Sequence, residues 1–177
     1  MPSDLIVRRA EPADFDAWFE LFEEVAAEGT GIAAELPVDP ERLRASFHGT
    51  LENEHAARFV ALIDDQVVGE LGVFDHYGVP DLGMMVRDGH RGQGVGTALL
   101  QACIDWARAA GAYKVTLTVF PHNAAGRALY RKHGFVEEGR LVRHYRRQSG
   151  ELWDAIPMGL VLDHTSPGSS LDDAADR

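Results

Sequence analysis

The pattern of hydrophobic and polar positions along the chain predicts that helices and strands alternate. In residues 11–29 apolar side chains recur every three or four positions, which predicts a helix with one buried face. Helical spacing also predicts a helix that begins near residue 39 and two more over 98–111 and 123–133. Alternating or β-branched runs predict strands over residues 5–9, 58–63, 66–74, 79–86, 113–119, 135–145 and 152–162.

The order of these elements favours an α/β (α+β) fold. Helices and strands interleave through residues 1–162 without a repeat or a linker. We therefore expect one domain, with a mixed central sheet of about seven strands flanked by about four helices. Asp64-Asp65 is predicted to form a hairpin turn, although Asp-Asp is a weaker turn signal than Asp-Gly. Residues 163–177 are mostly polar, so we expect a flexible tail there.

Composition and charge exclude several classes of function. The 177 residues include 17 Lys and Arg against 28 Asp and Glu, and the resulting net charge of −11 disfavours a nucleic-acid partner. No apolar run reaches the roughly 20 residues of a membrane span, and none near the N-terminus is long enough for a signal peptide. The single cysteine, Cys103, rules out an internal disulfide. We expect a cytoplasmic protein with no membrane partner.

Other reactive-looking residues fit no catalytic or metal pattern. The chain has eight histidines, but it contains neither Cys-x-x-Cys nor His-Glu-x-x-His, so we expect no metal. Cys103 lies on the apolar side of its predicted helix and is expected in the core. The last predicted hairpin carries a basic run, Arg140, Arg143, Arg146 and Arg147. We expect this run on a solvated face, with a dimer contact or a site for an acidic substrate group as alternatives.

A glycine-rich segment, residues 87–97, lies between a predicted strand and a predicted helix. It is not a P-loop, because no lysine follows its glycines, and Thr97 replaces the third glycine of a dinucleotide fingerprint. It does satisfy Arg/Gln-x-x-Gly-x-Gly/Ala with Arg91, Gly94 and Gly96. Glycines permit close approach, so the loop amides can face an anion at the helix N-terminus. The alternative is a tight turn that binds nothing.

A second group of polar residues follows one strand later, in residues 119–135. Asn123, Arg127 and Tyr130 are spaced by four and three residues, so they share one face of the predicted helix. Asn123 can cap that helix or reach a ligand, and Gly134 is typical of a residue just past a helix end. On spacing alone, Tyr130 can equally be a half-buried aromatic residue with no catalytic role.

Together the two segments resemble the signatures of the GNAT N-acetyltransferase superfamily. Residues 86–96, Val-Arg-Asp-Gly-His-Arg-Gly-Gln-Gly-Val-Gly, are similar to its acetyl-CoA motif. Residues 123–135 are similar to its signature of Asn followed by Ala-x-x-Leu-Tyr-x-x-x-Gly-Phe, with Gly126 where the family usually has Ala. The resemblance covers residues 5–162. It implies a GNAT-like domain with splayed central strands, acetyl-CoA as co-substrate, and a homodimer as an option, since dimers are common in the family.

The resemblance also implies which residues meet the cofactor. The glycine loop would hold the pyrophosphate of coenzyme A, and the pantetheine arm would lie along the strand that ends at Val86. The thioester would lie near Tyr130. The implied cofactor-binding residues are Met84, Met85, Val86, Arg91, Gly92, Gln93, Gly94, Val95, Gly96, Thr97, Asn123, Arg127 and Tyr130.

The reaction implied is direct attack of a primary amine on the thioester. Only a neutral amine attacks, so a base is useful, and Glu70 resembles the position of the family's catalytic carboxylate. The alternative for Glu70 is an acid on the solvent face of a strand. Asp75, His76 and Glu28 are weaker candidates for the base. Tyr130 is expected to donate a hydrogen bond to the departing sulfur, because full proton transfer from a phenol to a thiolate is uphill.

The acceptor expected from the resemblance is a small molecule such as an amino acid or an amino-acid-like compound. A protein N-terminus of the ribosomal-protein type is the first alternative, and a non-catalytic acyl-CoA-binding module is the second. The sequence leaves the identity of the amine, the length of the acyl chain and the oligomeric state open.

Overall fold

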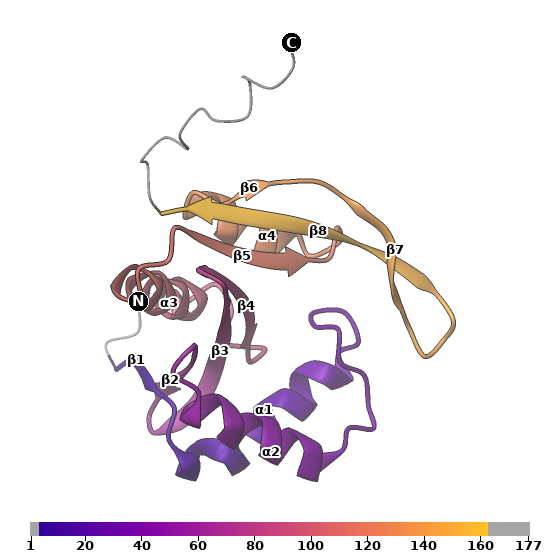
Figure 1. Cartoon of the computed structure of the whole chain (residues 1–177). Coiled ribbons are helices and arrows are strands. Elements are labelled where there is room, and N and C mark those ends of the chain that lie inside the picture. Colours follow the sequence, from indigo (N-terminus) through magenta and orange to yellow (C-terminus); the bar gives the residue numbers. More distant parts are fainter. Residues whose placement is uncertain (1–3, 163–177) are drawn as a thin grey trace.

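The computed structural model describes residues 4–162, which form one eight-stranded sheet and four α-helices (Figure 1). The strands are β1 (Ile6–Arg9), β2 (Ala56–Ile63), β3 (Gln66–His76), β4 (Val79–Val86), β5 (Lys114–Val119), β6 (Val136–Glu137), β7 (Leu141–Arg146) and β8 (Leu152–Val161). The helices are α1 (Phe15–Ala27), α2 (Pro40–Glu52), α3 (Val95–Ala109) and α4 (Ala124–Lys132), and a short 3-10 helix, Pro12–Asp14, precedes α1. The predicted tail, residues 163–177, lies outside the described residues.

The sheet is mixed, and its centre is only loosely joined. The strand order is β1-β2-β3-β4-β5-β8-β6, with β7 paired to β8. Every neighbouring pair is antiparallel except β4 and β5, which are parallel and share only two residue pairs, Asp81 with Thr116 and Leu82 with Leu117. Beyond Leu82 the two strands separate, so the edge of β4 from Gly83 to Val86 has no β5 partner. The expected splay of the central strands is therefore present.

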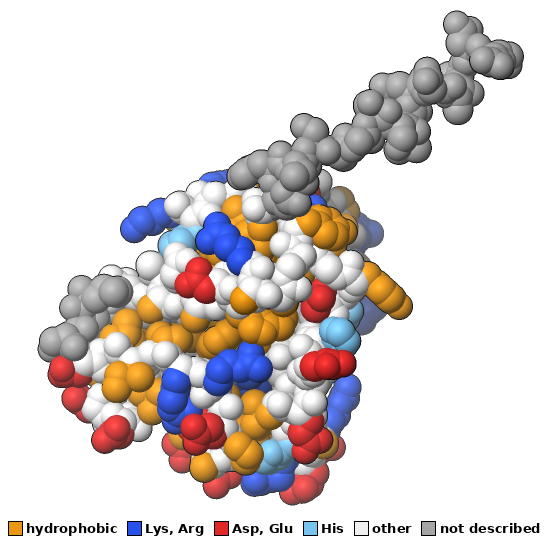
Figure 2. Space-filling model, turned by 60° about the vertical axis from the view of Figure 1, so that its left-hand side comes forward, with side chains coloured by type: hydrophobic (Ala, Val, Ile, Leu, Met, Phe, Trp, Pro, Cys, Tyr) orange, Lys and Arg blue, Asp and Glu red, His pale blue; other side chains and the backbone are white. Residues whose placement is uncertain are grey.

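Two hydrophobic layers cover the sheet. Leu99, Leu100 and Cys103 of α3 pack with sheet residues on one face, and the expectation that Cys103 is core is confirmed. On the other face Trp18 of α1 and Phe47 of α2 pack against residues of β2, β3 and β4. Over the face seen in Figure 2, acidic and basic side chains are interspersed around a band of apolar ones. No helix within residues 4–162 has the length and apolarity needed to cross a membrane.

Local signals in the sequence explain where several elements begin and turn. The Asp39 side chain caps α2 by accepting hydrogen bonds from the amides of Glu41 and Arg42. Asp64 and Asp65 do form the hairpin turn, with positive φ angles of 50° and 61°. Aspartate tolerates this region better than most residues, so the turn forms without glycine.

The predicted strand over residues 135–145 is wrong in one respect, because the structure divides it into β6 and β7. β7 forms a ribbon with β8, and their register shifts between Leu141 and Tyr145. Arg143, inside this irregular stretch, has a positive φ of 54°. That irregularity lies within β7. The break between β6 and β7 covers residues 138–140, where the Glu138 amide donates to the carbonyl oxygen of Pro157 in β8 but Pro157 has no amide hydrogen to donate in return. The β7–β8 ribbon projects beyond the rest of the sheet, as Figure 1 shows.

Candidate active site

The place where β4 and β5 separate borders a cavity of about 500 Å³. Residues from α1, α2, α4 and strands β2 to β5 line it, together with part of the segment that connects α1 to α2. The predicted site residues that share this cavity are Glu70, Met84, Met85, Asn123 and Tyr130. The fold therefore brings a strand edge, an acid and a phenol together from distant parts of the chain.

Tyr130, in α4, lines the cavity and packs its ring into the hydrophobic core. The residue is 7% exposed, and its ring lies 5.8 Å from the ring of Phe135, measured between centroids. Burial raises the pKa of Tyr130 to about 12, and the nearby Cys103 adds to this effect. Burial also raises the pKa of Cys103 to about 12, so both groups stay protonated near neutral pH. Tyr130 can thus donate a hydrogen bond to a group in the cavity.

Glu70 is buried, which contradicts the alternative of an acid on a solvent face. It lies on β3 directly across from Met85 of β4, and it forms an ion pair with Arg58 of β2. Arg58 is buried as well, and its guanidinium lies 4.9 Å from the centroid of the Trp18 ring. Burial raises the pKa of Glu70, while the positive charge of Arg58 opposes the rise. The cavity therefore contains a desolvated pair of opposite charges.

Asp81 is a further acid in the same cavity, at a position that the motifs of the sequence do not single out. The Thr116 hydroxyl donates a hydrogen bond to it at 3.0 Å. Its side chain reaches solvent, yet loss of surrounding water raises the pKa of Asp81, and the Thr116 bond and the charge of His76 oppose this only in part. An acid inside an otherwise apolar strand was the available signal. Asp75, by contrast, accepts from the Gly78 amide at 2.8 Å, as expected of a polar turn.

The glycine loop between β4 and α3 has a backbone that fits a bound pyrophosphate. Gly92 and Gly94 have positive φ angles of 74° and 94°, a region that favours glycine. Gly94 caps α3, so the amides of the first turn, Val95 to Thr97, have no acceptor within the helix. A side-chain carbon built at Gly92 would meet nothing within 4 Å, which leaves open space beside the loop.

The polar side chains of this loop are bonded to the protein itself. Arg91 Nε donates to the Val86 carbonyl oxygen at 2.9 Å, and Arg91 Nη2 donates to the Glu28 carboxylate at 2.6 and 2.9 Å. Gln93 Nε2 donates to the Gly89 carbonyl oxygen at 2.6 Å. These bonds hold the loop against β4 and the end of α1. They also engage Glu28 in an ion pair away from the cavity-lining residues.

Gly96 is needed for a second physical reason besides access to phosphate. A Cβ atom at this position would lie 2.9 Å from the Leu129 side chain of α4 and 3.5 Å from the side chain of Met84. The first distance is shorter than a normal carbon contact, so a larger residue would force the Leu129 side chain to move. The glycine therefore also serves the packing of the two helices that flank the cavity.

Asn123 and Arg127 share a helix but do not share an environment. The Asn123 side chain accepts from the Gly126 amide at 2.9 Å, so its expected capping role is confirmed, and it also lines the cavity. Arg127 donates to Glu137 at 2.8 and 3.0 Å and to the Pro121 carbonyl oxygen at 3.1 Å. It is not among the residues that line the cavity.

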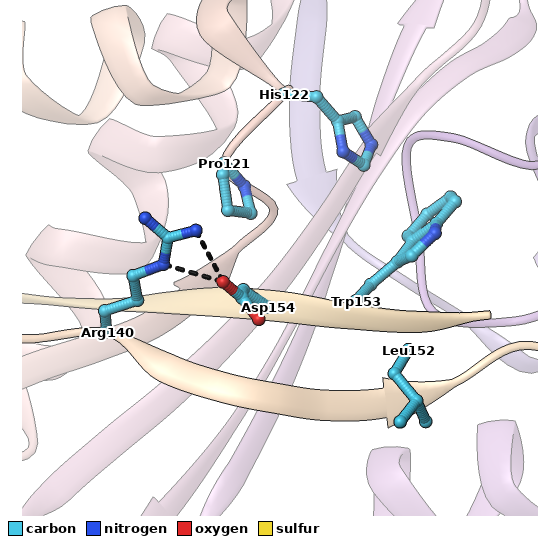
Figure 3. A pocket seen from close by; sticks show the side chains of 6 residues that line it. All are labelled: Pro121, His122, Arg140, Leu152, Trp153 and Asp154. Atoms are coloured by element: carbon cyan, nitrogen blue, oxygen red, sulfur yellow. Dashed lines mark hydrogen bonds and ion pairs between the residues drawn. The ribbon is translucent and has the colours of Figure 1, made fainter.

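A smaller hollow of about 250 Å³ lies between the β7–β8 ribbon and the residues that follow β5 (Figure 3). It is lined by Pro121, His122, Arg140, Leu152, Trp153 and Asp154. The rings of His122 and Trp153 are 4.8 Å apart between centroids, and Arg140 donates to Asp154 at 2.7 Å. None of the predicted site residues lines this hollow, so the larger cavity is the candidate active site.

Comparison with known proteins agrees with this geometry. Residues 15–135 match the Acetyltransferase (GNAT) family, and the chain belongs to that family. It is 28% identical to the L-methionine sulfoximine/L-methionine sulfone acetyltransferase of Pseudomonas aeruginosa, over 90% of this chain and 95% of that protein. It is 29% identical to the L-amino acid N-acetyltransferase of Escherichia coli, over 90% and 99%. A solved ribosomal-protein-alanine N-acetyltransferase from Brucella melitensis superposes with a TM-score of 0.81 and 26% identity, over 89% and 99%.

Family membership confirms the resemblance identified from the glycine loop and the Asn123–Phe135 segment. The protein is an acyltransferase of the GNAT type, and the family implies acetyl-CoA as the co-substrate. Within residues 4–162, no group of three or more His, Cys, Asp or Glu side chains is arranged to hold a metal ion.

Proposed function

We propose that this protein transfers the acetyl group of acetyl-CoA to the primary amine of a small, amino-acid-like acceptor. The observation that carries the proposal is the single cavity shared by the open edge of β4, the Tyr130 phenol and the buried Arg58–Glu70 pair. An amino acid carries an amine and a carboxylate, and this cavity offers both signs of charge within apolar walls. Relatives named as amino-acid acetyltransferases support the same class of acceptor.

The donor is assigned to the glycine loop and the open strand edge. Main-chain amides of Gly92, Gly94 and the first turn of α3 would bind the pyrophosphate, while Arg91 and Gln93 brace the loop. The unpaired edge of β4, from Gly83 to Val86, would hydrogen-bond the amide-rich pantetheine arm. When bound, acetyl-CoA supplies an activated thioester carbonyl, to which the amine nitrogen bonds as the carbon–sulfur bond breaks.

Tyr130 is proposed to stabilise the leaving sulfur by a hydrogen bond. A thiol leaving group has a pKa of about 8.5, and the pKa of Tyr130 is raised to about 12. Moving the phenol proton to the thiolate is then uphill by about 3.5 pKa units, or roughly 5 kcal/mol. The phenol therefore keeps its proton and shares it with the sulfur, and coenzyme A takes its proton from water.

Glu70 is proposed as the base that accepts the amine proton. Burial raises the pKa of Glu70, which strengthens it as a proton acceptor, and the positive charge of Arg58 opposes this rise. Asp81 is the second candidate, because its pKa is raised and it forms no ion pair with a Lys or Arg among residues 4–162. Both carboxylates line the acceptor cavity, so substitution decides between them.

The experiment compares Glu70→Gln with Asp81→Asn, using Asp105→Asn, an exposed position on α3 outside the cavity lining, as a control. We expect Glu70→Gln to lower kcat/KM by about 10²- to 10⁴-fold and to abolish the acidic limb of its pH profile. Asp81→Asn should leave kcat/KM within about threefold of the value of the unaltered protein and should keep the acidic limb of the pH profile. The opposite pattern would assign the base to Asp81. Because Glu70→Gln leaves Arg58 without its counter-charge, circular dichroism must first show that the variant is folded.

Thiol release from acetyl-CoA, measured across amines, amino acids and short peptides, tests the function itself. We expect the highest kcat/KM with free amino acids or close analogues. A clear preference for peptides with a free N-terminus would favour the second candidate function, which the Brucella structure supports. If no amine causes thiol release while acetyl-CoA still binds, the protein is instead a binding module and the proposed function is wrong.

We also propose a cytoplasmic location, with no nucleic-acid, membrane or metal partner. A net charge of −11 and a single cysteine support this setting. A homodimer remains a proposal from the family resemblance. Light scattering of the full chain measures its mass, and a monomer at micromolar concentration would contradict the dimer.

A further inference from the structure

The buried arginine at the tip of the β7–β8 ribbon is not used by the chemistry described so far. Arg147 was expected on a solvated face, but it is only 4% exposed, whereas the adjacent Arg146 is exposed. Arg147 Nη1 donates to the Ala33 carbonyl oxygen at 3.0 Å, and Nη2 donates to the Gly29 carbonyl oxygen at 3.3 Å. Its Nε lies 3.4 Å from the Glu35 carboxylate. One guanidinium thus joins three points of the segment 29–35.

Neighbouring groups strengthen this attachment. The Arg147 guanidinium lies over the Trp153 ring, 4.3 Å from its centroid, and Trp153 in turn contacts His122. Figure 3 shows these two rings close to each other, with Trp153 extending from β8. His122 Nε2 lies within hydrogen-bond distance, 3.0 Å, of the Thr30 carbonyl oxygen. The Gln148 amide donates to the second oxygen of Glu35 at 2.9 Å. Residues from the C-terminal third of the chain therefore fix the segment at four of its residues.

The segment 29–35 borders the acceptor cavity. Its residues Gly31, Ile32, Ala33 and Ala34 line the same cavity as Glu70 and Tyr130. The segment contains no regular helix or strand, so no ladder of its own backbone hydrogen bonds holds it in place. Arginine suits this task because its planar guanidinium can donate to several acceptors at once, whereas lysine is a single point charge.

We propose that Arg147 is a positioning residue that holds segment 29–35 as one wall of the acceptor cavity and thereby sets the affinity for the amine. This inference rests on the proposed function. The donor loop should not depend on Arg147, because its own tether, Glu28, lies at the end of α1. The buried face of α1, which includes Trp18 and Leu21, fixes Glu28 independently. Loss of Arg147 should therefore weaken acceptor binding and leave acetyl-CoA binding unchanged.

The test compares Arg147→Ala and Arg147→Lys with Arg146→Ala, the matched control on the same ribbon. We expect Arg147→Ala to raise the KM for the preferred amine about tenfold or more, and to leave the KM for acetyl-CoA and kcat within about twofold. Arg147→Lys should recover only part of the loss, because one ammonium group cannot reach all three acceptors. Arg146→Ala should match the unaltered protein. Equal KM values for the amine in Arg147→Ala and Arg146→Ala would overturn the inference.

Limited proteolysis of the full chain by elastase, which cleaves after small residues such as Ala33 and Ala34, provides a readout that needs no acceptor. Cleavage within residues 29–35 should be at least about tenfold faster in Arg147→Ala than in Arg146→Ala. Unchanged cleavage would overturn the proposed attachment, whereas failure of the unaltered protein to acetylate any amine would overturn the proposed function instead. If Arg147→Ala does not fold, Glu35→Gln removes one contact of the same cluster and should show the same changes more weakly. No change in Glu35→Gln would then count against the attachment.

Discussion

Replacing Tyr130 by Phe removes one hydroxyl from the cavity and leaves the packed ring in place. The hydroxyl has a pKa raised to about 12, so it acts as a hydrogen-bond donor and not as a full acid. A hydrogen bond to a charged group contributes about 1.5–3 kcal/mol, and the sulfur becomes charged only as the thioester breaks. We therefore expect Tyr130→Phe to lower kcat by about 10- to 150-fold, with little change in the KM for acetyl-CoA.

Thiol release at saturating acetyl-CoA measures this effect, with exposed Tyr113→Phe as the control that loses the same hydroxyl elsewhere. Circular dichroism should show both variants folded, because the contact of the Tyr130 ring with Phe135 survives. An unchanged kcat would remove Tyr130 from the chemistry. A loss of kcat beyond about 10⁴-fold would also refute the hydrogen-bond argument, because a loss of that size would require the phenol to donate its proton fully.

Three further results are expected. Gly94→Ala places a side chain at a φ of 94° and should raise the KM for acetyl-CoA about tenfold. Gly49→Ala, whose new side chain meets open space in α2, is the control and should leave this KM unchanged. Equal KM values in the two variants would refute the loop assignment. Cys103 is fully buried, and its pKa is raised to about 12. A thiol reagent should therefore label it roughly 100-fold more slowly in the folded than in the unfolded chain. Rapid labelling of the folded chain would contradict its placement in the core. Hydrogen bonds from Arg8 hold the pKa of Asp14 below its ordinary value, so their stabilisation is complete above pH about 4 and is lost as the pH falls through the lower, folded-state pKa. Urea unfolding should show Asp14→Asn about 1 kcal/mol less stable than the unaltered protein at neutral pH, with a difference that closes in acid, and a difference independent of pH would count against the ion pair.

The parts of the fold that sequence predicts well are those decided by neighbouring residues. The Asp64-Asp65 turn, the cap at Asn123 and the glycine loop before α3 each depend on local backbone preferences, and each is present. The break between β6 and β7 does not follow from the segment itself, because it lies where Glu138 meets Pro157 of β8, a residue distant in the sequence. Local chemistry therefore predicts elements and caps better than it predicts strand continuity.

Features that depend on the pairing of residues far apart in the chain could not be predicted from the sequence. Arg58 and Glu70 meet because β2 and β3 pair in a register that the sequence pattern does not specify, so Glu70 remained equally compatible with a solvent-exposed position. Arg147 contacts Ala33, which lies 114 positions earlier, and a basic run gives no sign of such a contact. Asp81 lies inside a predicted strand, and it reaches the cavity at one of the two residue pairs that join β4 to β5, which the sequence does not show.

The two residue pairs that join β4 to β5 have a consequence for the cohesion of the molecule. Main-chain hydrogen bonding is nearly interrupted at the middle of the sheet, so the two halves adhere mostly through the shared apolar layer beneath α3. Main-chain groups along this seam are left for water to satisfy when no ligand lies there. A ligand that bridges the seam would make it more rigid, so occupancy and resistance to unfolding should rise together. The chain thus has the fewest main-chain hydrogen bonds between strands at the centre of its sheet, where it needs room for its substrates.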